Sequence, residues 1–255
     1  LVTSAIIIRL PFLLMGIASV MLVFVIARRW YGEWPALLPT AVLAVTQFTV
    51  YYSVIARPYV AGLFLMLCML YCWTRILLEK EYKLHWLALL ALSSAACAYT
   101  QYFCMLSAFL LGLAGLLFVD RQHWWRYLLA CIGAVLLFLP HWSITSHQLF
   151  DLQGIGGAGG WLGKPTPSFL PEHLRYLFHY SWIVIGVVVV GYLLVFSPKD
   201  FRKNIKLISV SWLMWLLPLA IGYFYSVKVN PVLQFSSLIF VFPFFPLLAD
   251  RKSVV

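Results

Sequence analysis

Long apolar runs separated by short polar connections are the main pattern along this chain. A transmembrane helix needs about 20 mostly apolar residues, because each residue advances about 1.5 Å along the helix axis. A helix also satisfies its own backbone hydrogen bonds, which lipid cannot do. The pattern therefore predicts an all-α transmembrane helix bundle of about nine helices. The expected spans are residues 10–26, 35–50, 59–78, 84–99, 103–118, 127–142, 182–196, 205–223 and 232–248.

Composition supports a membrane environment. Of the 255 residues, 64% are hydrophobic and only 10% are charged, and the mean hydropathy is +0.94. Such a chain has too few polar side chains to cover a water-soluble surface. We therefore interpret residues 1–255 as a single transmembrane domain. The formal net charge of +10 does not indicate a nucleic-acid partner, because the basic residues lie in short clusters between the apolar runs.

The basic residues alternate between the two sides of the expected bundle. One set of connections holds 13 of the 18 Lys and Arg residues, and the other holds 5. The basic-rich side is expected to be cytoplasmic, which places the N-terminus outside and the C-terminus inside. The cytoplasmic set is Arg28, Arg29, Arg75, Lys80, Lys83, Arg121, Arg126, Lys199, Arg202, Lys203, Lys206, Arg251 and Lys252, and the outer set is Arg9, Arg57, Lys164, Arg175 and Lys228.

An outside N-terminus needs a preceding segment that carries it across the membrane. The chain is therefore expected to be an N-terminally truncated fragment that lacks at least one transmembrane helix and the outer loop after it. The longest connection, residues 143–180, is expected to form an outer-face loop. Within it, Gly154, Gly156 and Gly159 fit a G-x-G-x-x-G pattern. No strand precedes them and no helix pattern follows, so a flexible loop is the better interpretation than a dinucleotide site.

One short outer turn carries residue types that suit a phosphate and a sugar. Residues 51–59, YYSVIARPY, contain Arg57 and three tyrosines between two spans. A guanidinium holds phosphate through paired donors, and tyrosines offer hydroxyls and stacking faces. The same residues also suit an interfacial belt in which the arginine reaches lipid headgroups. From residue types alone, both interpretations stay open.

Several segments at consistent intervals resemble bacterial GT-C glycosyltransferases of the protein-mannosyltransferase and lipid A aminoarabinose-transferase type. Residues 51–59 resemble the S-x-E-A-R-x-Y motif after the third helix of that family. Residues 9–12, RLPF, resemble its R-L-P-S entry, and residues 27–32, ARRWYG, resemble its G-R-R-L-F-G inner turn. Residues 98–103, AYTQYF, resemble its L-Y-T-H-Y-F outer turn, and residues 231–243 resemble its P-x-x-x-x-R-Y-x-x-x-x-x-P segment.

The chain also departs from those family motifs. Ile55 stands where the family has an acidic residue, and Gln101 stands in place of a histidine. Ser236 and Ser237 occupy the region of an expected arginine. The catalytic acid of such enzymes lies in an outer loop that would precede Leu1, so the catalytic residue is unknown within this chain.

The resemblance implies an integral protein of the bacterial inner membrane that transfers a sugar from a polyprenyl-phosphate donor to an acceptor on the outer face. A carboxylate would deprotonate the acceptor hydroxyl while cations stabilise the leaving lipid phosphate. The implied phosphate-binding residues are Arg57, Lys228 and Arg9. The implied sugar- or acceptor-binding residues are Tyr52, Tyr59, Gln101 and Tyr102. No cofactor is certain, a divalent metal and the oligomeric state stay open, and the other expected partner is membrane lipid.

Two outer carboxylates, Asp151 and Glu172, are alternative bases, although carboxylates of loops are usually only solvated. The four histidines of this region have no metal-binding spacing; they are His141, His147, His173 and His179. The five cysteines lie in or beside apolar runs and are interpreted as small buried apolar residues; they are Cys68, Cys72, Cys97, Cys104 and Cys131.

Two other classes of function remain. A transporter or flippase without chemistry would place ionisable residues or broken helices near the bilayer midplane. The expected spans are almost free of charge, and no internal repeat is visible. A structural or assembly subunit would need no organised outer polar cluster. Polar residues gathered at the outer ends of spans therefore favour a site at the membrane surface.

Overall fold

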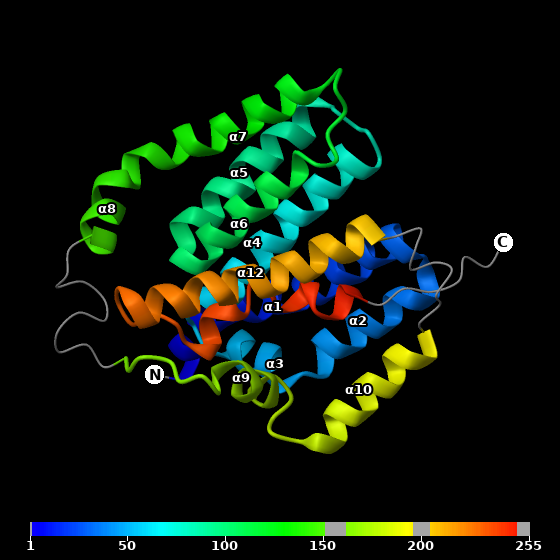
Figure 1. The fold of residues 1–255 in the computed structure, drawn as a ribbon, viewed down its shortest axis with the longest axis vertical. Helices are drawn as coiled ribbons and strands as arrows, with labels where there is room; N and C mark the ends of the chain where they lie inside the picture. The colour runs from blue at the N-terminus through cyan, green and yellow to red at the C-terminus, as the bar shows by residue number, and fades with distance from the viewer. Residues whose placement is uncertain (1, 151–161, 196–204, 249–255) are drawn as a thin grey trace.

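The structure is a computed structural model that describes residues 2–150, 162–195 and 205–248. Its described part is a helical bundle without strands (Figure 1). The α-helices are α1 (Val2–Tyr31), α2 (Glu33–Val45), α3 (Gln47–Val54), α4 (Pro58–Trp73), α5 (Leu84–Thr100), α6 (Tyr102–Gly115), α7 (Trp124–Phe138), α8 (Trp142–Phe150), α9 (Phe169–Leu177), α10 (Trp182–Val195) and α12 (Ile205–Lys228). A π-helical turn, Thr74–Leu78, extends α4, and a 3-10 turn, Leu139–His141, joins α7 to α8.

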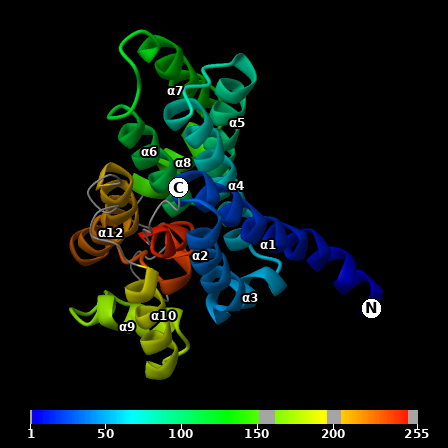
Figure 2. The same cartoon turned by 90° about the vertical axis from the view of Figure 1, so that its right-hand side faces the viewer.

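Eight of the nine expected spans are helical in the structure, which confirms the all-α membrane bundle. Among the described residues, four helices are long and apolar enough to cross a membrane, or up to six if each bent helix pair counts as one span. Helices α5 and α6 are shorter apolar helices. The bundle is built around α4, which packs against α1, α5 and α6, while α5 also packs against α7 (Figures 1 and 2).

The expected span at residues 35–50 is broken. Helices α2 and α3 meet at an angle of 53°, and Thr46 between them has an extended backbone with a ψ of 122°. The Thr46 hydroxyl donates to the carbonyl of Val42, and the Thr49 hydroxyl donates to the carbonyl of Thr46 at 2.9 Å. Threonine hydroxyls that bond to nearby backbone compete with the helix, so this sequence can stop one helix and start another inside an apolar run.

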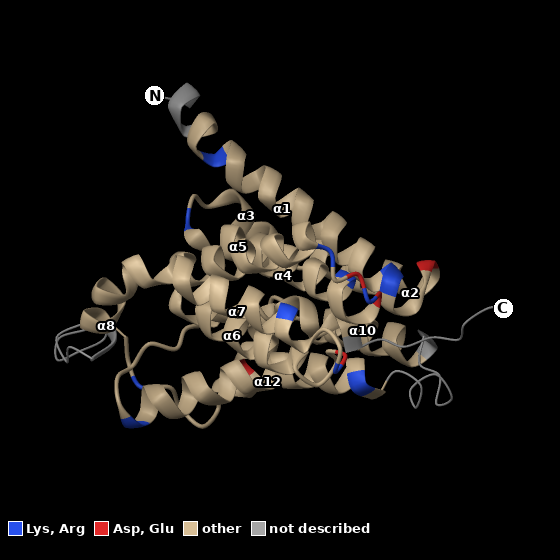
Figure 3. Ribbon diagram, turned by 90° about the horizontal axis from the view of Figure 1, so that it is seen from above, with Lys and Arg blue, Asp and Glu red and all other residues tan. Residues whose placement is uncertain are grey.

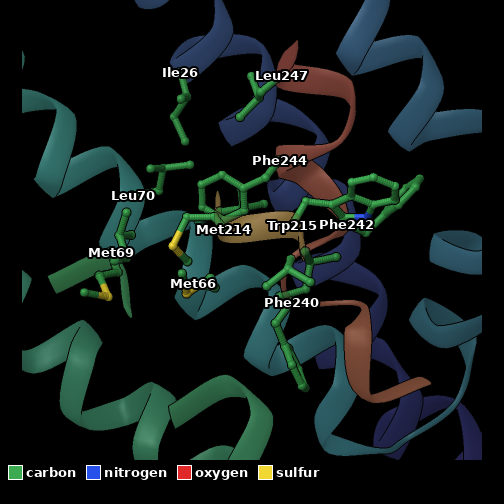
Figure 4. Packing of buried hydrophobic residues seen from close by; sticks show 14 of the residues in the cluster. Ile26, Met66, Met69, Leu70, Met214, Trp215, Phe240, Phe242, Phe244 and Leu247 are labelled. Atoms are coloured by element: carbon green, nitrogen blue, oxygen red, sulfur yellow. The ribbon is translucent and has the colours of Figure 1, made fainter. Parts of the chain in front are cut away.

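The ninth expected span, residues 232–248, was predicted wrongly as a helix. The chain there makes three short 3-10 turns, Phe235–Leu238, Phe242–Phe244 and Pro246–Leu248. Pro243 and Pro246 lack the backbone N–H that a continuous helix requires. Phe240, Phe242 and Phe244 are fully buried. In the core, Phe244 lies beside Met214 of α12 and Phe242 lies beside Trp215 (Figure 4). Residues 232–248, which we call the strap, therefore fill the core and do not form a lipid-facing helix.

The region expected as a loop, residues 143–180, contains ordered helices at both ends. Helix α8 continues α7 from Trp142, and α9 lies beside α3. Helix α9 is bent by 84° from α10. Asp151 and the glycines Gly154, Gly156 and Gly159 lie outside the described residues.

Candidate functional site

A cavity of about 330 Å³ opens where several helices end together. Its position follows from the topology, because α5 ends and α6 begins at the same level as the first turn of α4 and the last turns of α12. The volume falls in the range of roughly 300–1,000 Å³ that small-molecule sites occupy. The cavity is lined by Tyr59, Ala98, Tyr99, Thr100, Gln101, Tyr102, Phe103, His141, Gln148, Tyr225, Asn230, Val232, Gln234 and Ser237.

Gln101 shapes the turn between α5 and α6. Its backbone is extended, with φ −169° and ψ 149°, and its side-chain oxygen accepts hydrogen bonds from the N–H of Phe103 at 2.8 Å and of Cys104 at 3.4 Å. This is an N-cap, which satisfies backbone donors that the first turn of a helix leaves unpaired. The cap uses only the oxygen, and the amide nitrogen of the same side chain carries two further donors.

The tyrosines on the cavity side belong to a connected aromatic group. The rings of Tyr59 and Tyr52 meet edge to face, with centroids 4.9 Å apart. The hydroxyls of Tyr52 and Tyr176 lie 3.2 Å apart, which links α3 to α9. Tyr52 does not line the cavity, but its ring packs against that of Tyr59, which does. Two other lining residues are also linked, since the Tyr102 hydroxyl donates to the side-chain oxygen of Gln148 in α8.

The turn after α12 closes another wall of the cavity. Ser226 is fully buried, and its hydroxyl oxygen accepts hydrogen bonds from the N–H of Val232 at 3.1 Å and of Leu233 at 2.9 Å. Ser226 therefore fixes the turn that carries Asn230 and Gln234 to the cavity. The serine's role cannot be read from the sequence, because it depends on contacts six and seven residues away.

The structure brings together three of the seven residues that the resemblance implied: Tyr59, Gln101 and Tyr102 line one cavity. Other lining residues were not expected as site residues, namely His141, Gln148, Tyr225, Asn230, Gln234 and Ser237. Asn230 is a polar residue just before an apolar run, and that position was the signal that could have marked it.

The three cations expected to bind phosphate do not line the cavity. Arg57 is exposed at the N-cap of α4, two residues before Tyr59. Lys228 is exposed at the end of α12, two residues before Asn230. Arg9 is exposed on α1. Arg57 and Lys228 thus flank lining residues along the chain, whereas Arg9 has no such neighbour.

The described lining of the cavity contains no Asp, Glu, Lys or Arg. Glu172, considered as a base, is exposed on α9 and accepts a hydrogen bond from the Ser168 hydroxyl at 2.5 Å. His141 lines the cavity and shares a hydrogen bond of 2.9 Å with Thr145, while His173 is buried against Phe169 and Phe235. Within the described ranges, no group of three or more His, Cys, Asp or Glu residues could hold a metal ion.

Charged residues gather at the opposite end of the bundle. The π-helical turn that follows α4 carries Arg75, which pairs with Glu79 and Glu81 at 2.7 Å each. Lys80 pairs with Asp120 at 2.7 Å after α6, and Arg29 of α1 also reaches Glu79. Figure 3 shows basic and acidic segments side by side near the start of α2. Since α4 starts at the cavity and ends at these pairs, its two ends meet different environments.

Comparisons with known proteins agree with this architecture. A sequence model of the family described as dolichyl-phosphate-mannose-protein mannosyltransferase matches residues 2–144, which is more than half of the chain. The structure is similar to the crystal structure of ArnT from Cupriavidus metallidurans in the apo state, with a TM-score of 0.64 and 15% sequence identity. No curated protein matches the chain.

The similarity to ArnT covers 94% of this chain and 44% of that chain, so this chain spans less than half of that protein's length. At 15% identity, the similarity concerns the fold alone. The family match confirms the resemblance to GT-C membrane glycosyltransferases and the interpretation as an integral membrane protein. The chain belongs to the dolichyl-phosphate-mannose-protein mannosyltransferase family.

Proposed function

We propose that the full-length protein is a GT-C-type glycosyltransferase that moves a sugar from a polyprenyl-phosphate donor to an acceptor, and that the cavity binds the sugar or the acceptor. The observation that carries this proposal is the meeting of Tyr59, Gln101 and Tyr102 in one cavity. These residues belong to two separate segments that resemble motifs of the family. Uncharged hydrogen-bonding groups beside aromatic rings suit a sugar, which presents hydroxyls and apolar ring faces.

The proposed reaction breaks the bond between the sugar and the lipid phosphate and forms a bond to the acceptor oxygen. A general base removes the proton of the acceptor hydroxyl, and the lipid phosphate leaves with the electron pair. Arg57 and Lys228 are the proposed partners of that phosphate, because both are exposed cations next to the segments that line the cavity. A guanidinium binds phosphate oxygens through two parallel donors. We assign the general base to none of the described lining residues.

The proposed orientation places the cavity on the outer side of a bacterial plasma membrane and the ion-paired end in the cytoplasm. The excess of basic residues at the ion-paired end supports this orientation. Single cysteines at Lys228 and Lys83, in a variant without the five native cysteines, allow a direct test. A membrane-impermeant thiol reagent added to intact cells should label position 228, and position 83 should be labelled only after permeabilisation.

A transporter or flippase without chemistry is the second candidate, and the break between α2 and α3 is the observation that favours it, because broken helices often line transport sites. In this protein Thr46, at the break, is buried, and Phe48 packs on Tyr52, Tyr176 and Phe242. The break is therefore filled by aromatic side chains and does not line the cavity. This arrangement supports the transferase over the transporter.

The test uses the purified full-length protein in lipid nanodiscs with a polyprenyl-phosphate sugar and candidate acceptors. Transfer should release free polyprenyl phosphate, whereas a transporter would leave the donor intact. Tyr59→Phe and Tyr102→Phe should each lower transfer about two- to tenfold, the effect of one lost neutral hydrogen bond. Tyr71→Phe is the matched control, because Tyr71 lies at the ion-paired end beside Arg29. Intact donor with wild-type protein, or equal effects of all three variants, would overturn the proposal.

A further inference from the structure

A second hollow lies between α5 and α7, near the ion-paired end of the bundle. This α5–α7 groove has a volume of about 490 Å³ and is lined by Tyr82, Leu84, Leu87, Ala88, Ala91, Trp125, Arg126, Leu129 and Ala130. Alanines on both helices leave the space open. The proposed transfer reaction does not use the groove, because the sugar cavity lies at the other end of α5.

The groove has an apolar body and a single charged lining residue. Arg126 is exposed in the first turn of α7, and its guanidinium carbon lies 5.2 Å from the centre of the Trp125 ring. Trp124 and Trp125 are also exposed. Exposed tryptophans at helix ends mark the headgroup level of a bilayer. The groove therefore extends from the headgroup level, at Arg126, toward the hydrocarbon, at Leu129 and Ala91.

Among the described residues, some of the basic side chains at this end of the bundle have no carboxylate partner. The carboxylates of Glu33, Glu79, Glu81 and Asp120 are each already paired with a basic side chain. In the described part of the chain, neither Arg121 nor Arg126 forms an ion pair with a carboxylate. An apolar groove with an uncompensated cation at its mouth complements a molecule that has an anionic head and an apolar tail.

We propose that the α5–α7 groove binds an anionic phospholipid of the surrounding bilayer. The lipid phosphate accepts hydrogen bonds from the Arg126 guanidinium, and an acyl chain lies along Leu87, Ala91 and Leu129. A guanidinium can bind two phosphate oxygens at once, and basic residues at a membrane surface attract anionic lipids. A zwitterionic lipid with acyl chains of the same length would fill the apolar part of the groove equally well, but its headgroup has no net negative charge to attract Arg126.

Native mass spectrometry of the purified full-length protein tests this site. The protein is mixed with phosphatidylglycerol or with phosphatidylcholine of the same chains, and the retained lipids are counted. The wild type should retain phosphatidylglycerol in preference to phosphatidylcholine. Arg126→Gln should lower the retention of phosphatidylglycerol about fivefold, and Arg126→Lys should keep most of it. Ala88→Phe, at an exposed lining position, should lower the retention of both lipids by filling the groove.

Lys206→Gln is the matched control, because Lys206 is an exposed basic residue at the start of α12 and does not line the groove. Equal retention of the two lipids by the wild type, or unchanged retention in Arg126→Gln, would overturn the proposal. So would a dimer that Ala88→Phe abolishes, because the groove would then be a contact between copies. If glycerol phosphate binds as well as phosphatidylglycerol does, the site recognises phosphate alone. If polyprenyl phosphate displaces phosphatidylglycerol, the groove binds the lipid of the sugar donor. Both outcomes contradict a phospholipid site.

Discussion

The ring of Phe240 lies directly against the backbone of Gly62, so that a Cβ atom at residue 62 would be 2.5 Å from the Phe240 Cε1 atom. Phe240 is fully buried in the strap of 3-10 turns, and Gly62 is in α4. The close approach requires a glycine at this position. Gly62→Ala is therefore expected to lower the free energy of unfolding by about 1–3 kcal/mol, the usual effect of overpacking a core. Thermal unfolding in detergent measures the change.

Gly112→Ala is the control for Gly62→Ala, because an added Cβ at Gly112 of α6 meets nothing within 4 Å. It should leave the melting temperature unchanged or raise it slightly, since alanine favours a helix. Phe240→Leu combined with Gly62→Ala should cost less than the sum of the two single changes, because the smaller side chain relieves the clash. Additive losses would contradict the proposed contact.

Ser226→Ala is expected to destabilise the protein by about 1–3 kcal/mol, because the buried N–H of Leu233 and the partly buried N–H of Val232 lose their acceptor. Since the affected turn carries Asn230 and Gln234, the rate of sugar transfer should fall as well. Ser94→Ala is a suitable control, because the Ser94 hydroxyl only bonds to the Leu90 carbonyl of its own helix. Equal effects of both variants on transfer would show that Ser226 does not position the turn.

Acid is expected to weaken the ion-paired end through Glu81. The hydrogen bond from the Trp86 ring N–H, at 2.9 Å, and then the Arg75 guanidinium hold the pKa of Glu81 below its usual value. The pKa of Glu81 is lower in the folded protein than in the unfolded chain, so ionised Glu81 stabilises the fold at pH values above the ordinary pKa of about 4.5. This stabilisation is lost as the pH falls through the pKa of the folded state. The melting temperature should fall below about pH 4.5, and less so in Glu81→Gln.

Glu33→Gln is the matched control for this pH dependence. Glu33 pairs with Arg28, but both side chains are more than half exposed, so solvent screens the pair. The acid-induced fall in the melting temperature of Glu33→Gln should match that of the wild type. If Glu81→Gln retains the full acid sensitivity, the depressed pKa of Glu81 is not its cause.

Arg57→Ala is expected to lower kcat/KM for the polyprenyl-phosphate sugar by about 10- to 100-fold, because hydrogen bonds to a charged group are worth about 1.5–3 kcal/mol. Arg57→Lys should recover part of the loss, since lysine keeps the charge but lacks the planar fork. Arg28→Ala, at the opposite end of the bundle, should behave as the wild type does. A wild-type kcat/KM for Arg57→Ala would remove this residue from the proposed phosphate site.

The sequence predicted the central helices closely. The expected spans 59–78 and 84–99 nearly coincide with Pro58–Leu78 and Leu84–Thr100, because charged residues bound these apolar runs. Residues 232–248 were mistaken for a helix, because hydropathy treats a run rich in phenylalanine and proline like any other apolar run. Tyr59, Gln101 and Tyr102 could be expected together, since all three end or begin spans on one side. Gln148 and Gln234 could not, because their positions depend on α8 and on the strap.

The non-helical strap has a consequence for how the protein is made. Its backbone is bonded within short turns and to side chains of helices, as where the Tyr31 hydroxyl donates to the Leu247 carbonyl at 2.7 Å. Irregular backbone is not tolerated against lipid, so residues 232–248 are not expected to enter the bilayer as an independent segment. We expect them to dock after α2, α4, α6 and α12 have been inserted, since these helices form the surface against which the strap packs. Packing of the strap into the core is therefore expected to be a step that is separate from the insertion of these helices and follows it.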